Sequence, residues 1–326
     1  MRLSIIIPVY NVEKYILMCL RSVLENNLRE EDFEIIVVDD ESPDGSIAIV
    51  REVTAGFPNI RIISQQNTGI SGARNSGIRN AQGRFIMFID SDDWIKPDSL
   101  LNMLRLCEDS DLDILEFGIE KRNNDGSVGG TFSASTNGNV LNGTDYYKQI
   151  RYVNSVFNKI YRREFVETLQ LFFAEKIYVE DFELNTRAFL VAKRVMAIPD
   201  LVYQYRQSDN SITRTTDTGK KKKMIDDHVV VLQKTDALYR EETDSEKKAF
   251  LGERMSFLVV SIFYLMLKNQ YSFDDMKEMR KELTRQGIYH IDFPVHQKNK
   301  NVFRKILLKN FTLLSLLRNL SRKRPT

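Results

Sequence analysis

The stretch FIDSDDW at residues 88–94 places three carboxylates, Asp90, Asp92 and Asp93, directly after the apolar run 85–89. A short, continuous apolar run is typical of a buried parallel strand, and the carboxyl ends of such strands face the crevice where open α/β sheets bind ligands. Three acids within four positions repel one another unless a cation neutralises them. Carboxylate oxygens suit Mg²⁺ or Mn²⁺, which keep coordination positions free for substrate phosphates. The stretch therefore predicts a divalent-metal site formed by these three aspartates.

Strand-like and helix-like segments alternate around this stretch, which is typical of βαβ units and a parallel sheet with right-handed crossovers. A Gly-rich segment, NTGISGARNSGIRNAQG at 67–83, leads from a loop into a helix just before the strand at 85–89. Residues 122–144 are rich in Asn, Gly, Ser and Thr and predict a loop or a hairpin. The other expected strands are 3–9, 33–38, 60–64 and 114–117, and the other expected helices are 15–24, 46–53 and 100–107.

The composition is that of an ordinary soluble protein, since 42% of the 326 residues are hydrophobic and 28% are charged. Cys19 and Cys107 lie in apolar helical contexts, so we expect buried free thiols and a reducing compartment. The three histidines lack metal-ligand spacing, which argues against a zinc site. The first expected strand begins at Leu3, which leaves no room for a signal peptide, and the longest apolar stretch, 255–267, is too short to span a bilayer. We therefore expect a cytoplasmic protein, at most peripheral to the membrane.

The charge is unevenly distributed along the chain. The formal net charge is +2, yet residues 298–326 hold nine Lys and Arg residues and no acidic residue, which leaves −7 on residues 1–297. Within 302–320, apolar residues recur at helical spacing and most basic residues fall off that stripe, as in an amphipathic helix that lies on an anionic membrane surface. The alternative is a helix packed on the body, against 255–267, with its charges in solvent. The acidic body makes nucleic acid an unexpected partner.

Four motifs, in this order and spacing, resemble the family 2 glycosyltransferases of the GT-A fold. The resemblance covers roughly residues 1–215. It implies an α/β fold with a Rossmann-like, mostly parallel sheet flanked by helices. It also implies an inverting enzyme that uses a nucleotide sugar and a divalent metal, Mn²⁺ or Mg²⁺. The motifs are SIIIPVYN at 4–11, EIIVVDDESPDGS at 34–46, NTGISGARNSGI at 67–78 and FIDSDDW at 88–94.

The resemblance also implies roles for the residues that match the family's motifs. Asp40, at the end of the second strand, would accept a hydrogen bond from the nucleobase, and Asp39 beside it would contact the nucleotide or hold the loop. Pro8 and Tyr10, at the end of the first strand, and Arg74, in the Gly-rich motif, would lie near the nucleotide or its diphosphate. Taken alone, a strand-end pair of aspartates is also typical of a turn, and a helical arginine is often a surface residue.

In the acid motif, the resemblance implies that Asp92 contacts the ribose or the metal, that Asp93 binds the metal and that Asp90 supports this site. A fifth element, YVEDFELNTR at 178–187, matches the family's Glu-Asp pair before an acceptor-site helix, and Asp181 would be the catalytic general base. Inversion needs a carboxylate that deprotonates the acceptor hydroxyl as it attacks the anomeric carbon. Without the resemblance, a helix N-cap is the simpler interpretation of Asp181, and it is an alternative for the acid motif too.

Lys159, Arg206 and Ser211 lie in further segments that resemble the family, and they are candidates for diphosphate or acceptor contacts. One position departs from the family pattern, because the usual DDGS reads DDES, with Glu41 in place of glycine. We expect this difference to change the loop backbone near the base. It weakens any inference about which base is bound.

These observations predict a glycosyltransferase domain at 1–215, with a nucleotide-binding half (1–118) and an acceptor half (119–215), followed by a helical extension at 216–326. The resemblance implies transfer from a nucleotide-diphosphate sugar, with UDP-sugars the first choice, to a hydroxyl of a saccharide or polyprenyl-linked saccharide. Such reactions build cell-surface polysaccharides, capsules among them. The alternative is a non-catalytic sugar-nucleotide or glycan-binding protein that retains the fold, and a homodimer stays open. A nucleotidyltransferase is excluded, because YNVEKY at 10–15 has no glycine for a phosphate loop.

Overall fold

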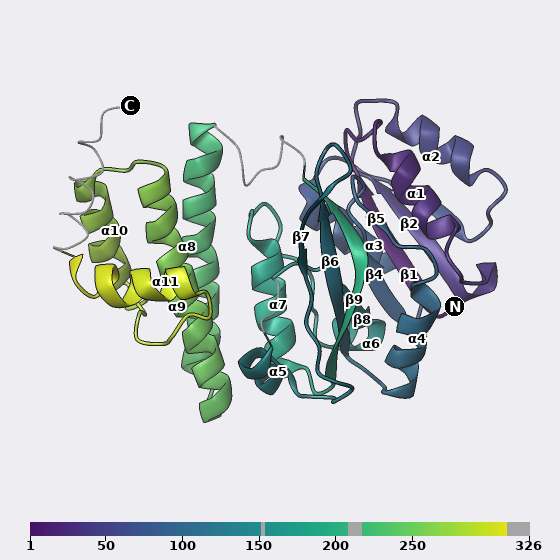
Figure 1. Ribbon diagram of the computed structural model, residues 1–326. Helices are drawn as coiled ribbons and strands as arrows, with labels where there is room; N and C mark the ends of the chain where they lie inside the picture. Colours follow the sequence, from purple (N-terminus) through teal and green to yellow (C-terminus); the bar gives the residue numbers. More distant parts are fainter. Residues whose placement is uncertain (151–153, 208–216, 312–326) are drawn as a thin grey trace. The chain divides into compact units, whose positions relative to one another are not determined.

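A computed structural model describes residues 1–150, 154–207 and 217–311 of the chain (Figure 1). The chain divides into two compact units. The first unit comprises Met1–Lys176 and Glu180–Arg214, and the second comprises Ile177–Val179 and Thr215–Thr326. The short segment Ile177–Val179 lies within the predicted glycosyltransferase domain, but it is grouped with the helical second unit.

The sheet of the first unit begins with four parallel strands in the order β3-β2-β1-β4. Ile5 of β1 lies level with Ile35 of β2 and Met87 of β4, and all three side chains are fully buried. Apolar residues on both faces are expected where helices cover both sides of a parallel sheet. The strands predicted from the apolar runs are confirmed, with bounds β1 (Leu3–Val9), β2 (Phe33–Asp39), β3 (Ile60–Ser64) and β4 (Phe85–Phe88).

The helices between these strands pack closely on the sheet. Helix α3 contacts β1 and β2, and a Cβ atom added at Gly77 would lie 2.3 Å from Cγ2 of Ile6. The missing side chain of Gly77 therefore lets α3 approach β1 closely, which fixes the helix that carries Arg74. Helix α1 packs on α2 and on strand β5. The bounds are α1 (Ile16–Leu24), α2 (Ser46–Thr54), α3 (Gly69–Asn80) and α4 (Leu100–Asp109).

The second half of the sheet mixes parallel and antiparallel pairs. Strand β8 pairs antiparallel with β4 and β6, β7 forms a hairpin with β6, and β9 runs parallel to β6 and antiparallel to β5. The parallel arrangement is thus confined to the first four strands and the β6–β9 pair. Strand β9 ends at Arg206 and pairs with β5, the short strand that follows the acid motif. The bounds are β5 (Trp94–Ile95), β6 (Ile114–Arg122), β7 (Val128–Phe132), β8 (Lys159–Arg162), β9 (Val195–Arg206), α5 (Gly143–Gln149), α6 (Arg163–Thr168) and α7 (Glu180–Val191).

The second unit is helical, and its helices α8, α9 and α10 begin at side-chain caps. Asp217 and Asp244 accept backbone hydrogen bonds at the starts of α8 and α9, and Ser272 with Asp275 forms a capping box at the start of α10. The long helices α8 and α9 pack against each other along their length (Figure 1). The bounds are α8 (Thr218–Glu241), α9 (Ser245–Lys268), α10 (Phe273–Arg285) and α11 (Lys298–Phe303), followed by a π-helical turn at Arg304–Leu308.

Helix α9 is longer than the apolar stretch 255–267 that the sequence analysis considered. With 24 residues it is long and apolar enough to cross a membrane, yet 72% of its most apolar 18-residue window is buried within the protein. Core helices of soluble proteins have the same length and composition. The expectation that this region is too short to span a bilayer was therefore wrong, because the helix is long enough. Its burial is that of a core helix.

The described part of the basic tail packs on the second unit. Phe303 and Phe311 are each 8% exposed, and the Phe311 ring lies 5.7 Å from that of Phe263 and 5.3 Å from that of Phe273. Of the two interpretations of the tail, membrane contact and packing on the body, the second describes these two residues. Ile306 points outward and is 49% exposed. Residues 312–320, where the predicted amphipathic stripe continues, lie outside the described residues.

Candidate active site

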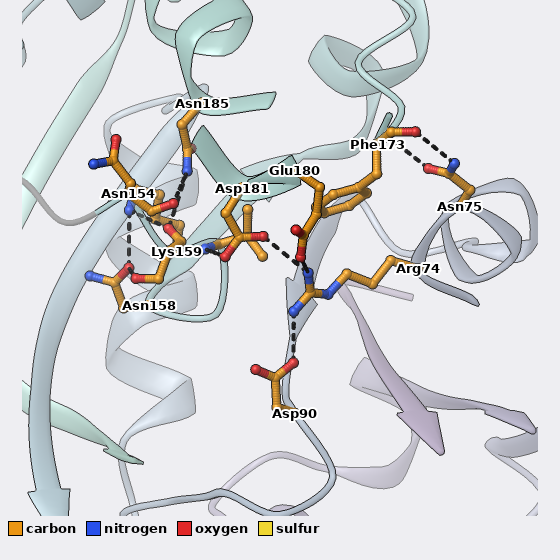
Figure 2. Close-up of polar contacts among 12 residues, drawn as sticks. Arg74, Asn75, Asp90, Asn154, Asn158, Lys159, Phe173, Glu180, Asp181 and Asn185 are labelled. Carbon is orange, nitrogen blue, oxygen red and sulfur yellow. Dashed lines mark hydrogen bonds and ion pairs between the residues drawn. The ribbon is translucent and has the colours of Figure 1, made fainter. Parts of the chain in front are cut away.

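The site centres on the guanidinium group of Arg74, which α3 presents to carboxylates from two distant segments (Figure 2). Nη2 of Arg74 lies 2.8 Å from Oδ1 of Asp90, directly after β4. Nη1 lies 3.1 Å from Oε1 of Glu180 and 3.0 Å from Oδ1 of Asp181, at the start of α7. Arg74 is only 2% exposed, so this buried cation joins the acid motif to the Glu-Asp pair.

A second contact on α3 holds the chain that leads to α7. The amide of Asn75 donates to the carbonyl of Phe173 at 3.0 Å and accepts from the backbone N–H of Phe173 at 2.8 Å (Figure 2). The Phe173 ring lies under the guanidinium, 5.2 Å from its carbon atom. Adjacent residues of one helix thus position both the backbone before α7 and the carboxylates at its start.

Burial raises the pKa of both Glu180 and Asp181, and the positive charge of Arg74 opposes this shift. The side chain of Asp181 is 24% exposed, against 12% for Glu180. Oδ2 of Asp181 accepts the backbone N–H of Val156 at 3.3 Å, which fixes the orientation of the carboxylate. An oriented, partly exposed carboxylate with a raised pKa is a stronger base than an ordinary aspartate and is suited to accept a proton.

The remaining acids of the motif are crowded and poorly compensated. Burial, together with the charge of Asp90, raises the pKa of Asp92 to about 6. Burial and the charges of Asp92 and Asp90 raise the pKa of Asp93 well above its usual range. Oδ1 of Asp93 accepts the backbone N–H of Arg206 at 2.7 Å, whereas its Oδ2 is buried without a hydrogen-bond partner. This orphaned oxygen and its charged neighbours fit a divalent cation.

Metal binding by Asp90, Asp92 and Asp93 together stays a prediction. Among the described residues, no group of three or more His, Cys, Asp or Glu side chains is arranged to hold a metal. The reason is visible in Figure 2, since Asp90 is committed to Arg74. A cation at Asp92 and Asp93 would need further oxygen ligands from a substrate.

Arg206 and Tyr203, both on β9, complete the surroundings of the acid motif. Nε of Arg206 donates to the carbonyl of Asp92 at 3.2 Å, and the Tyr203 hydroxyl accepts the backbone N–H of Asp90 at 3.1 Å. Arg206 was predicted as a candidate for substrate contact. In the structure it binds the acid motif and holds it in position. The role of Tyr203 was missed, because only its register on β9 against β5 brings it to the motif.

The predicted nucleotide contacts surround the ends of β1 and β2. Asp40 is 3% exposed, and its carboxylate accepts the backbone N–H groups of Thr68 and Gly69 at 3.0 and 2.8 Å, at the start of α3. Asp39 is half-buried and accepts the backbone N–H of Ser42 at 2.9 Å. The structure therefore uses Asp40 to cap a helix, and its predicted contact with the base stays a prediction.

Of the other predicted nucleotide residues, Pro8 is buried in β1 and Tyr10, just after it, is 51% exposed. Glu41 adopts a φ of 62°, the left-handed region that glycine takes most readily. The side chain therefore does not force another backbone, contrary to expectation. Instead, its Oε2 accepts the backbone N–H of Asn67 at 3.1 Å and joins the loop after β2 to the loop before α3.

Lys159 does not face a substrate. It is fully buried, its Nζ lies 3.2 Å from Oε2 of Glu116, and it donates to the carbonyl of Ser155 at 2.7 Å. Its charge acts on the site from within the protein, by lowering the pKa of Asp181. Ser211 lies outside the described residues.

Comparison with known proteins identifies the family of the chain. The family model for glycosyl transferase family 2 matches residues 4–170, which is more than half of the chain and includes Arg74 and the acid motif. The chain belongs to glycosyl transferase family 2. The family predicted from the four motifs is thus confirmed.

Relatives of this family 2 chain include EpsH of Bacillus subtilis (strain 168), a putative glycosyltransferase that is 30% identical over 308 residues, which are 91% of this chain and 85% of EpsH. EpsJ of the same strain is 36% identical over 217 residues, 64% of this chain and 62% of EpsJ. TarS of Staphylococcus aureus (strain Mu50 / ATCC 700699), a poly(ribitol-phosphate) beta-N-acetylglucosaminyltransferase, is 30% identical over 63% of this chain. The chain spans only 35% of TarS.

Solved structures confirm the fold. Residues 1–349 of S. aureus TarS, in complex with UDP-GlcNAc, match with a TM-score of 0.63 at 21% identity, over 88% of this chain and 92% of that one. The mannosyltransferase PcManGT of Pyrobaculum calidifontis, in complex with GDP-Man and Mn²⁺, matches with a TM-score of 0.56 at 16% identity, over 99% of this chain and 88% of that one. The predicted α/β fold of the GT-A class with C-terminal helices is confirmed.

Replacement of the central cation gives the first prediction. Arg74→Met leaves Glu180 and Asp181 buried without their counter-charge, which should lower the free energy of unfolding by about 3 kcal/mol at about pH 8. In the variant their folded-state pKa values lie further above the ordinary value of about 4. The loss of stability caused by their charges is therefore small below that value, and it grows as the pH rises from that value to the folded-state pKa values. The loss should shrink markedly at about pH 5.

The measurement is urea unfolding of both proteins at the two pH values, followed by fluorescence of Trp94, the single tryptophan of the chain, which lies in the first unit. Arg79→Met is the matched control. Arg79 lies on the same helix, and the contact observed for its guanidinium is with the face of the Phe172 ring. This substitution should cost about 1 kcal/mol or less at both pH values. A loss for Arg74→Met that does not depend on pH would contradict the charge argument.

Proposed function

We propose that this chain is an inverting glycosyltransferase that transfers a sugar from a UDP-sugar to a hydroxyl of a saccharide or lipid-linked saccharide in cell-surface polysaccharide synthesis. Membership of glycosyl transferase family 2 supports transfer from a nucleotide sugar. Relatives named as beta-glucosyl- and beta-N-acetylglucosaminyltransferases of poly(ribitol-phosphate) support an inverting reaction and a polysaccharide acceptor. The TarS structure with UDP-GlcNAc supports uracil as the base.

The observation that carries the proposal is the convergence on Arg74. It brings Asp181, a candidate proton acceptor, to the same guanidinium as Asp90, the first residue of the acid motif. A glycosyl transfer needs both functions within the length of one sugar. One must hold the leaving diphosphate, and the other must take the proton of the attacking hydroxyl.

In the proposed reaction, Asp181 accepts the proton of the acceptor hydroxyl while the oxygen attacks the anomeric carbon from the side opposite the diphosphate. Arg74 and the backbone N–H of Val156 hold the carboxylate in position. Asp92 and Asp93 would hold Mn²⁺ or Mg²⁺, which when bound stabilises the charge of the departing diphosphate. From an α-linked donor the product is β-linked.

The base of the nucleotide would lie at the ends of β1 and β2, against Pro8 and Tyr10. Of the two adjacent aspartates, Asp39 is the one that keeps partial exposure, whereas Asp40 is covered and already accepts bonds from α3. We therefore assign the direct contact with the base to Asp39, and to Asp40 the positioning of the Gly-rich segment.

A non-catalytic binding protein of the same fold is the second candidate, and the geometry of Asp181 argues against it. A binding module gains nothing from an oriented, partly exposed carboxylate whose pKa is raised by burial. The cost of burying such a charge is more readily explained by a proton-transfer role.

We also propose that the protein acts at the cytoplasmic face of a membrane, where lipid-linked acceptors are accessible. The support is the nine basic residues in the sequence of 298–326, of which Arg304 is buried, and the outward-facing apolar residues Val302 and Ile306, which are 55% and 49% exposed beside Lys305. Apolar and basic side chains on one surface suit an anionic interface.

The second prediction concerns the general base. Asp181→Asn should reduce transfer at least about 100-fold, because general-base catalysis is worth 10² to 10⁴, while the affinity for UDP stays within about threefold, a change of less than ~1 kcal/mol. Transfer is measured as UDP released from UDP-glucose and UDP-N-acetylglucosamine with a panel of saccharide acceptors. Asp200→Asn, at an exposed carboxylate of β9, is the control and should retain full activity. Equal loss of transfer and UDP binding in Asp181→Asn would sink the base assignment.

The third prediction separates membrane contact from packing. A chain that ends at Phe311 keeps the packed part of the tail but loses residues 312–326, which include four basic residues. It should fold like the full chain and lose most of its binding to vesicles rich in phosphatidylglycerol, measured by co-sedimentation. Vesicles of phosphatidylcholine alone are the control and should bind neither protein. Unchanged sedimentation of the shortened chain with the anionic vesicles would refute a membrane role of residues 312–326.

A further inference from the structure

A cleft of about 530 Å³ lies between α1 and the segment that directly follows the acid motif. Its volume is in the range of small-ligand sites, which span roughly 300–1,000 Å³. It belongs entirely to the first unit, and none of its lining residues is among those predicted to contact nucleotide or metal. The lining side chains used below are Lys14, Met18, Arg21, Glu25, Trp94 and Pro97.

The two walls of the cleft are tied together by side chains of α1 and the residues just after it. Oγ of Ser22 accepts the backbone N–H of Ile95 at 3.2 Å, and Nδ2 of Asn26 donates to the carbonyl of Lys96 at 2.9 Å. Oδ1 of Asn26 accepts the backbone N–H of Leu100 at 3.1 Å. These bonds join side chains of one wall to the backbone of the other. They give the cleft a fixed shape, as in preformed binding sites.

Arg206 connects the cleft to the acid motif. Its guanidinium carbon lies 5.1 Å from the centre of the Trp94 ring and 4.9 Å from that of Tyr15, and its Nη2 lies 3.6 Å from the sulfur of Met18. The backbone N–H of the same residue binds Asp93, the residue before Trp94. A ligand in the cleft would therefore adjoin the site where the diphosphate is expected.

The lining combines a flat apolar surface with cations. Trp94, Met18 and Pro97 provide the apolar part, and two exposed cations provide the charge, Lys14 in the turn before α1 and Arg21 on α1. Neither cation forms an ion pair with a carboxylate in the parts of the chain that the structure describes. Glu25 is the one acidic side chain of the lining. An indole can pack against the C–H face of a sugar ring, while paired cations select an anionic group.

We propose that this cleft is a subsite for an anionic saccharide, a sugar that carries a phosphate or carboxylate group. It would hold a part of the acceptor beyond the reacting hydroxyl, with the anionic group between Lys14 and Arg21 and the sugar ring against Trp94. The proposal rests on the proposed function only in calling this saccharide the acceptor. It gives the enzyme a means to prefer acidic polysaccharides over neutral ones.

The test uses Trp94, which is the single tryptophan of the chain and therefore reports directly on the cleft. Its fluorescence is followed while the full chain, without nucleotide, is titrated with a ribitol-phosphate oligomer, an oligoglucuronate and a neutral cello-oligosaccharide of the same length. A saturable change with one or both acidic oligomers, at least about tenfold tighter than with the neutral one, is expected. The oligomer that responds identifies phosphate or carboxylate as the source of the charge.

The variant Lys14→Glu/Arg21→Glu reverses both charges at exposed positions and should weaken the response at least about tenfold. Arg51→Glu is the matched control, because it reverses an exposed charge on α2, away from the cleft, and should leave the response unchanged. The response of the unaltered chain should also weaken as salt is raised.

No fluorescence change with either acidic oligomer would overturn the subsite, and so would an equal response to the neutral oligomer or in the doubly reversed variant. These titrations require neither donor nor transfer. An active enzyme that fails them refutes the subsite alone, whereas an inactive protein that passes them refutes the proposed function alone.

Discussion

The arrangement of the site in the first unit depends on the buried guanidinium of Arg74. One guanidinium, that of Arg74, faces three carboxylates at 2.8 to 3.1 Å, so the cluster keeps an excess of negative charge even when the cation is counted. Burying that excess is costly, and it raises the pKa of Glu180 and Asp181. Close helix packing at Gly77 and the paired bonds of Asn75 to Phe173 hold the segments that carry the cluster in position.

The same excess charge defines what the site can do. Asp90 gives one carboxylate oxygen to Arg74, and the orphaned oxygen of Asp93 is the atom that a cation would satisfy. In the proposed reaction, Asp181, the more exposed of the Glu-Asp pair, takes the proton of the acceptor. One interaction would thereby give the acids separate roles, with Asp90 structural, Asp92 and Asp93 cation-binding and Asp181 proton-accepting.

Much of this was predictable, because the first four strands, their helices and the acid motif are encoded in local patterns. The apolar run before Asp90 and the Gly-rich segment around Arg74 gave both the elements and their order. What local patterns could not give were the consequences of distant pairing. Lys159 looked like a substrate contact until β8 and β6 buried it against Glu116. Arg206 reaches Asp93 only through the register of β9.

The central claim is that the strand ends around Asp92 and Asp93 bind a nucleoside diphosphate together with a divalent metal. Calorimetric titration of the full chain with UDP, GDP, dTDP and CMP, each with and without Mn²⁺, tests it without knowledge of the acceptor. The account predicts that UDP binds in the presence of Mn²⁺ and that this binding is lost when the metal is removed. Failure of all four nucleotides to bind with Mn²⁺ present would contradict it.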